Sequence, residues 1–210
     1  MFEFFTVDFR IFFDYAVLVR TVLHIDFDSF FASVEEQSNF SLRGKVFGVT
    51  ATNGRTCIIA SSKSAKRYGI KTGTRVYEAK KLYPNIVLIP ANFPKYWEVS
   101  KELLKIASDY TPYVELFSID EVFMDITATK HLFEETTGVV QRMKTRIKNE
   151  IGEYITVSIG ISYNKLLAKL ASGLEKPDGL VEITPEGVER IYAKAKLTAF
   201  VVSASGLRSV

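Results

Sequence analysis

The order of the predicted strands and helices limits this chain to a small number of folds. Apolar strand patterns lie at 21–27, 113–117, 122–126 and 155–161, and helical periodicity marks 97–110 and 139–151. If residues 31–90 are set aside, the order is strand, helix, strand, strand, helix, strand. This order is the split βαβ arrangement of a ferredoxin-like domain. We therefore predict an α+β fold in which a ferredoxin-like sheet is interrupted by a 60-residue insertion.

The insertion is itself predicted to be a small α/β unit. A helical pattern starts at Ser29, and two β-rich runs, 45–51 and 57–60, flank Asn53-Gly54, a dipeptide typical of hairpin turns. The remaining predicted helices cover 61–68, 74–82 and 166–174, and the remaining strands cover 87–89 and 180–183. A last helix is expected to begin at Thr184, a capping hydroxyl that Pro follows at the first helical position.

Composition narrows the class of protein. Of the 210 residues, 47% are hydrophobic and 24% are charged, which is the balance of a chain that buries a core in water. After Val19, charges interrupt every apolar run before the roughly 18 residues that a membrane-spanning helix needs. Acidic residues interrupt the apolar segment within 1–20, which a secretion signal does not allow. The single cysteine and two histidines argue against a disulfide framework or a zinc site. We expect a cytoplasmic protein with no membrane partner.

Positive charge is concentrated in the insertion. Between residues 63 and 81 there are seven cations and one anion, Glu78. The cations are Lys63, Lys66, Arg67, Lys71, Arg75, Lys80 and Lys81. Such a run is typical either of a solvated helix face or of a surface that contacts phosphates, and the pattern alone leaves both open.

Acidic residues lie at the ends of two predicted strand segments. Asp26 and Asp28 end the first strand, and Asp120 and Glu121 lie in the hairpin between the strands at 113–117 and 122–126. The predicted topology makes these elements neighbours. Clustered carboxylates repel one another unless a cation lies among them, and Mg²⁺ prefers oxygen ligands that it shares with substrate phosphates. Each acid alone is equally well explained as a turn residue that faces water.

Four motifs resemble the successive signatures of Y-family DNA polymerases of the DNA polymerase IV type. Their order and spacing are those of the family, and the resemblance covers residues 21–183. The motifs are HIDFDSFFASVE at 24–35, SIDEVFMD at 118–125, GISYNKLLAK at 160–169 and KPDG at 176–179.

The resemblance implies a division of the chain into domains. It makes 21–30 and 91–183 the palm and 31–90 the fingers, a small insertion that covers the nascent base pair. Residues 1–20 form an extension without a family counterpart. Residues 184–210 correspond to a truncated start of the thumb, so that most of the thumb and the whole little finger are expected to be absent.

The resemblance also implies which residues hold metal. Asp26 and Asp120 match the metal ligands, and Glu121 matches the acid that holds the metal at the primer 3′ hydroxyl. The backbone carbonyl of Phe27 matches the group that completes the coordination shell of a metal ion. All three acids are thereby catalytic, with two Mg²⁺ ions as cofactors and Mn²⁺ as the alternative. Asp28 matches a position that is not usually a ligand.

The nucleotide side of the site follows from the same motifs. Phe31 matches the steric gate, an aromatic ring that collides with a ribose 2′ hydroxyl; without the motif it reads as an ordinary core aromatic. Phe30 is its neighbour in the implied nucleotide-binding set. Lys63 and Lys66 lie where relatives have a Tyr and an Arg that contact the triphosphate. The two lysines keep positive charge, but they lack the aromatic ring of Tyr and the forked guanidinium of Arg. Lys165 matches the triphosphate lysine.

The implied activity is template-directed DNA synthesis of the translesion type. The partners would be primer-template DNA and deoxynucleoside triphosphates, and the enzyme would be a monomer. The family binds the sliding clamp through a C-terminal peptide, which we expect to be absent here. Two alternatives stay open: a non-catalytic remnant that at most binds nucleic acid, and a cyclic-dinucleotide synthase, although the hairpin lacks the paired glycines of that class.

Overall fold

The chain is built on a five-stranded sheet with β1 at its centre. The computed structural model describes residues 20–51, 57–133 and 135–189. The strands are β1 (Val22–Phe27), β5 (Val114–Ser118), β6 (Glu121–Asp125), β7 (Val157–Ser162) and β8 (Leu180–Ile183). Their order is β5-β6-β1-β7-β8; β1 is antiparallel to β6 and β7, and β8 is parallel to β7. The predicted ferredoxin-like order is confirmed, with β8 added at one edge.

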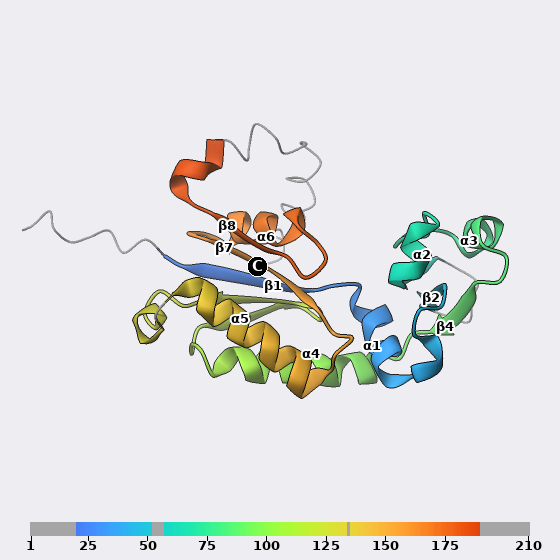
Figure 1. Cartoon of the computed structure of the whole chain (residues 1–210), viewed down its shortest axis with the longest axis horizontal. Coiled ribbons are helices and arrows are strands. Elements are labelled where there is room, and N and C mark those ends of the chain that lie inside the picture. Colours follow the sequence, from blue (N-terminus) through green and yellow to red (C-terminus); the bar gives the residue numbers. More distant parts are fainter. Residues whose placement is uncertain (1–19, 52–56, 134, 190–210) are drawn as a thin grey trace, which may run out of the picture.

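Helices cover both faces of this sheet, as Figure 1 shows. Helix α4 (Phe93–Ser108) and helix α5 (Thr136–Arg146) lie on one face, and α6 (Lys165–Leu174) lies on the other. Helix α5 continues as a π-helical turn, Ile147–Ile151. Helix α4 begins four residues before the predicted start at residue 97, because the side chain of Asn92 caps it by accepting a 3.1 Å hydrogen bond from the Lys95 N–H.

Close packing of α6 on β7 depends on one glycine. A Cβ atom at Gly160 would lie 2.0 Å from the carbonyl oxygen of Ala168 and 2.4 Å from the backbone nitrogen of Ser172. The backbone of α6 therefore lies almost directly on β7 at this point. This approach brings the side chains of α6 to the acids at the end of β1.

The insertion between β1 and α4 forms a second, smaller unit. Its helices are α1 (Phe30–Ser38), α2 (Lys63–Arg67) and α3 (Val76–Leu82), and its strands are β2 (Phe47–Thr50), β3 (Ile58–Ser61) and β4 (Val87–Pro90). The strands form a sheet of order β3-β2-β4. β2 and β3 are antiparallel, which confirms the predicted hairpin, although its Asn53-Gly54 turn lies outside the described residues.

Clusters of buried side chains support these units. The main cluster lies on the face of β1 that α4 and α5 cover, and it continues through α1 into β2, where Phe47 and Val49 join it. Two smaller clusters lie on the α6 face of the same sheet. A smaller cluster lies under α2 and α3 and consists of Ile58, Ala65, Ile70, Ala79 and Ile86. Three short 3₁₀ turns, Phe40–Leu42, Lys130–Leu132 and Pro185–Gly187, complete the described elements. No helix within the described ranges is long and apolar enough to cross a membrane.

Candidate active site

The predicted acids come together at the end of β1. Asp26 lies directly opposite Glu121 in the antiparallel pairing of β1 with β6. Residues directly opposite in such a pair project from the same face of a sheet, so the two carboxylates are neighbours. The N–H of Phe27 donates a 3.1 Å hydrogen bond to the carbonyl of Asp120, which fixes the β5–β6 turn against the same strand end. Asp26 and the Asp120–Glu121 turn, which are far apart in sequence, thus lie side by side.

Lysines neutralise two of these acids. Lys176 forms an ion pair with Asp26, and Lys169 of α6 forms one with Glu121. Burial raises the pKa of Asp26 to about 6, and the opposing charge of Lys176 limits that rise. Both lysines lie within the resembling motifs, but sequence reasoning gave them no role. Nothing in the local sequence indicates which acid each lysine would reach.

Glu121 has a second neighbour, His24. The buried ring of His24 places Nε2 3.4 Å from Glu121 Oε2, while Nδ1 lies 2.7 Å from the hydroxyl of Ser172. Burial lowers the pKa of His24, although Glu121 opposes that shift, so the ring is predominantly neutral at pH 7. Burial alone would raise the pKa of Glu121, but hydrogen bonds from His24 and Lys169 outweigh it and lower that pKa to about 2. Glu121 therefore carries its negative charge throughout the physiological range.

Asp28 points away from these acids and is fully buried. Its carboxylate accepts hydrogen bonds from the hydroxyls of Thr156 and Ser158, at 2.9 and 2.8 Å, and from the backbone N–H of Asp178 at 2.7 Å. Each donor is satisfied by a carboxylate oxygen. Asp28 thus ties the end of β1 to the segment that carries Lys176, which is a positioning role.

Phe31 lies in an aromatic group at the start of α1. Its ring stacks on the buried ring of Tyr96, with centroids 4.3 Å apart and planes at 17°, and the ring of Phe93 meets it edge-on at 5.7 Å. The Tyr96 hydroxyl donates a 2.8 Å hydrogen bond to Glu35, and Lys95 donates to the other oxygen of that carboxylate at 2.6 Å. Phe30 contacts the same group, with its centroid 5.4 Å from that of Phe31. The orientation of Phe31 is therefore set by its neighbours.

The predicted nucleotide lysines separate into two groups. Lys66 of α2 reaches the palm side, where its Nζ donates a 2.6 Å hydrogen bond to the hydroxyl of Ser29. Partial burial and then the positive charge of Lys176 lower the pKa of Lys66, so the two ammonium groups are within electrostatic reach of each other. Lys63 is exposed at the start of α2. Lys165 instead pairs with Glu115 of β5 and is not brought to the acids.

The acids at the end of β1 do not form a metal site of three side chains by themselves. Within the described ranges, no group of three or more Asp, Glu, His or Cys side chains is arranged so that it could hold a metal ion. The oxygen donors at this edge nevertheless suit Mg²⁺, which is commonly bound by one or two carboxylates together with substrate phosphates. The ammonium groups of Lys66 and Lys176, which affect each other electrostatically, suit the phosphates. The arrangement can therefore bind a polyphosphate and a hard cation together.

A ferredoxin-like palm with acids at the end of its central strand, beside a small fingers unit, defines the palm-and-fingers fold of Y-family DNA polymerases. The chain belongs to the impB/mucB/samB family, whose model matches residues 25–173.

Curated relatives agree with this membership. The DNA polymerase IV of Bacteroides fragilis strain YCH46 is 36% identical over 181 residues, and that of Gluconobacter oxydans strain 621H is 38% identical over 181 residues. Both alignments cover 86% of this chain, but 49% and 50% of the respective relatives. The chain spans about half the length of the curated relatives it matches.

Solved structures of Y-family polymerases are similar to most of this chain, which again matches only about half of each of them. The structure titled "Insertion ternary complex of Dbh DNA polymerase" is 29% identical with a TM-score of 0.77, over 85% of this chain and 53% of the other. "Crystal Structure of DinB from Sulfolobus solfataricus" is 27% identical with a TM-score of 0.76, over 88% of this chain and 56% of the other. The fold predicted from the motifs is thereby confirmed for the palm and fingers.

Proposed function

We propose that this chain is a template-directed DNA polymerase of the translesion type. In the proposed reaction, the 3′ hydroxyl of a primer attacks the α-phosphate of a deoxynucleoside triphosphate, and pyrophosphate leaves as the α–β phosphoanhydride bond breaks. The observation that carries the proposal is the pairing of Asp26 with Glu121 across β1 and β6, beside the turn that holds Asp120.

Asp26, Asp120, Glu121 and the carbonyl of Phe27 would hold two Mg²⁺ ions. When bound, such ions polarise the attacked phosphate and stabilise the attacking and leaving oxygens. The residues of the chain prepare this edge without metal, since Lys169 and Lys176 balance the carboxylate charges that would otherwise repel. A bound triphosphate offers Lys176 a second anionic partner, which frees Asp26 for the cation.

Lys66 and Lys176 are proposed to hold the triphosphate from opposite sides. Lys66 comes from the fingers and Lys176 from the palm, and each is within the electrostatic reach of the other. Two ammonium groups within electrostatic reach repel each other, and an anion between them would relieve that repulsion. Lys63 would add charge at the start of α2, whereas Lys165 would need to leave Glu115 before it could contribute.

Phe31 is proposed to select the sugar. Its ring is held by Tyr96 and Phe93, so it has little freedom to retreat from a ribose 2′ hydroxyl. A deoxyribose lacks that group and would fit. Phe30, which contacts Phe31, supports the same wall of the site.

The proposed reaction also indicates the substrates, the oligomeric state and the location of the protein. DNA and deoxynucleotides are the proposed substrates, and a monomer is sufficient because all of the named groups come from one chain. The curated relatives named above are bacterial proteins, so we place the activity in the cytoplasm, where bacterial DNA is found.

Single-nucleotide primer extension tests the proposal. At low salt with Mg²⁺, the chain should add the templated deoxynucleotide, and Asp120→Ala and Glu121→Ala should each lower the rate by at least about a thousandfold. Glu102→Ala, an exposed acid on α4, is the matched control and should keep the activity. Replacing Mg²⁺ with Mn²⁺ tests the metal preference.

A second set of variants tests whether Phe31 selects deoxyribose and whether the chain only binds nucleic acid. Phe31→Ala should raise ribonucleotide incorporation relative to deoxynucleotide incorporation, while Phe30→Ala should lower both. A folded chain that adds no nucleotide with either metal would contradict the polymerase proposal and favour a palm and fingers that only bind nucleic acid.

A further inference from the structure

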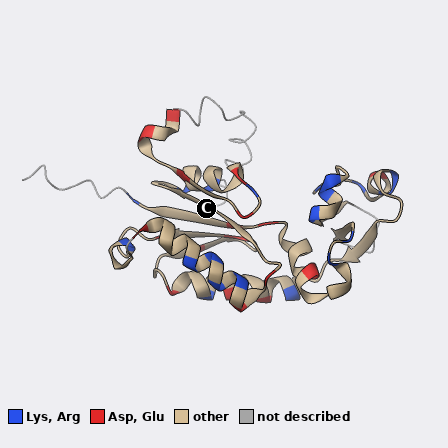
Figure 2. Ribbon diagram, in the orientation of Figure 1, with Lys and Arg blue, Asp and Glu red and all other residues tan. Residues whose placement is uncertain are grey.

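The fingers carry positive charge that the rest of the chain does not balance. Residues 31–90 contain ten Lys and Arg against three Glu, a net charge of +7, whereas the other 150 residues together carry −4. Figure 2 shows Lys and Arg on α2 and α3, while both signs are mixed over the palm. In the described part of the fingers, Arg43 is the one cation with a carboxylate partner, Glu153. Unpaired cations on one surface attract polyanions.

Part of this charge lines a pocket that is distinct from the acid cluster. The pocket has a volume of about 570 Å³ and lies where β2 and β4 begin, beside α2. Lys45 and Arg67 supply charge, Asn85 supplies an amide, and Tyr68 and Tyr83 supply aromatic surface. The two tyrosine rings lie 4.9 Å apart, and Tyr68 is 49% exposed. A volume in this range is typical of small-ligand sites.

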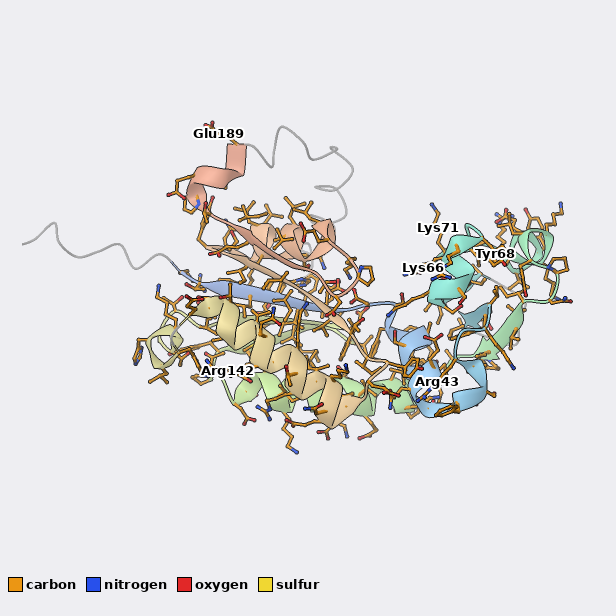
Figure 3. The ribbon with its side chains drawn as sticks, viewed as in Figure 1. Arg43, Lys66, Tyr68, Lys71, Arg142 and Glu189 are labelled. Atoms are coloured by element: carbon orange, nitrogen blue, oxygen red, sulfur yellow. The ribbon has the colours of Figure 1, made fainter. Side chains whose placement is uncertain are left out.

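Helix α2 lies between this pocket and the palm. Figure 3 shows Lys66 on the side of α2 toward the palm and Tyr68 on the side toward α3. Ser64, on the pocket side, donates a 3.0 Å hydrogen bond to the carbonyl of Gly44, which fixes α2 against the start of β2. The same short helix therefore serves two separate surfaces, and the acids are not needed for the pocket to form.

We propose that this pocket binds one unpaired nucleotide of single-stranded DNA. The base would stack on the exposed face of Tyr68, and Lys45 and Arg67 would contact the adjoining phosphates. The amide of Asn85 can both donate and accept at a base edge. In a duplex the base faces are already stacked, so aromatic surface combined with cations favours a single strand. The choice of DNA over RNA rests on the proposed function. The binding of a single-stranded nucleotide is argued from the pocket residues alone.

Fluorescence anisotropy with a labelled oligothymidylate and the full chain tests this assignment. Tyr68→Ala removes the stacking surface and should weaken binding by about tenfold, and Arg67→Glu should weaken it by at least as much. Lys80→Glu makes the same charge change on α3, away from the pocket lining, and should weaken binding by less than about threefold. Circular dichroism establishes that each variant is folded.

The opposite pattern would overturn the proposal. If Lys80→Glu weakens binding as much as Arg67→Glu and Tyr68→Ala has no effect, the strand binds by diffuse charge alone. If free thymidine monophosphate displaces the strand at equal nucleotide concentration, the pocket takes free nucleotides and the single-strand assignment is wrong. Asp120→Ala separates the two proposals, because it should abolish nucleotide addition and leave strand binding unchanged.

Discussion

The carboxylate of Asp28 accepts a 2.7 Å hydrogen bond from the backbone N–H of Asp178, 150 residues further along the chain. Asp28 follows Asp26 by two residues, and Asp178 follows Lys176 by two. This bond therefore fixes the two segments that carry the Asp26–Lys176 ion pair relative to each other. Removing the buried carboxylate of Asp28, which is not a proposed metal ligand, should therefore disturb the neighbouring ion pair.

Asp28→Asn should destabilise the fold and weaken nucleotide use. An amide replaces one acceptor oxygen with a donor that faces other donors, which costs about 1–3 kcal/mol. Urea denaturation measures this loss, and single-nucleotide incorporation should show a raised KM for the deoxynucleotide. Asp178→Asn is the control, because it keeps the backbone N–H and Asn tolerates the φ of 57° at this position. Equal stability of Asp28→Asn and the wild type would contradict the positioning role.

Metal binding should be visible as a change in melting temperature. In EDTA, Asp26→Asn should raise the Tm by about 2–5 °C, because a neutral amide replaces a buried carboxylate whose pKa is about 6. Mn²⁺ or Mg²⁺ at a hundredfold excess over its Kd should stabilise the wild type by about 2.7 kcal/mol. Asp26→Asn should lose this response, whereas Glu115→Gln, one strand beyond β6, should keep it. An equal response in all three proteins would place the cation elsewhere.

Gly160→Ala should be strongly destabilising. The added methyl group would meet the backbone of α6, so the helix must move, at a cost of about 2–4 kcal/mol. A displaced α6 also moves Lys169 from Glu121. Gly173→Ala on the same helix meets no atom within 4 Å and should instead stabilise by about 0.5–1 kcal/mol. Thermal unfolding of both variants checks the contrast, and a neutral Gly160→Ala would be inconsistent with the close approach.

Asp125 should make stability depend on pH. Burial alone raises its pKa, but hydrogen bonds from Thr127 and Arg20 outweigh that effect and lower it. A lowered folded-state pKa contributes stability above the unfolded value, which is 3.8, and this contribution is lost as pH falls through the folded value. Asp125→Asn should therefore cost about 1 kcal/mol at pH 7, and this cost should shrink as the pH falls below the unfolded value, to almost nothing at about pH 1.5.

Denaturant midpoints at the two pH values measure the difference. Glu102→Gln, an exposed acid of α4, should change stability by less than about 0.5 kcal/mol at both. A cost of Asp125→Asn that is the same at both pH values would show that its hydrogen bonds do not depend on the charge.

The fold could be predicted from periodicity, whereas the contacts of the site could not. Alternating apolar residues and turn signals located the strands, and their order implied that Asp26 and the Asp120–Glu121 turn are neighbours. Register, which pairs Asp26 with Glu121, depends on the packing of the whole sheet. Lys169 and Lys176 were missed as partners of the acids because each long, flexible side chain can reach several positions.

The start of α4 and the direction of the Lys165 side chain were not predicted, for two different reasons. The start of α4 depends on the capping side chain of Asn92, which precedes the apolar periodicity used to predict that helix. Lys165 lies at the start of α6 as predicted, but its direction, toward Glu115, follows from how α6 packs on Gly160. The position of a helix along the chain is thus more predictable than the rotation that aims its side chains.

The small cluster beneath α2 and α3 has a consequence for motion. Five buried side chains hold that layer, whereas the palm sheet is held by the main cluster on the face that α4 and α5 cover and by two smaller clusters on the α6 face. Segments with few buried contacts open at lower free energy than the global unfolding. Amide hydrogens of α2 should therefore exchange faster than those of β1, and the lysines of α2, with Tyr68 at its end, would sample open arrangements while the carboxylate of Asp26 on β1 stays in place.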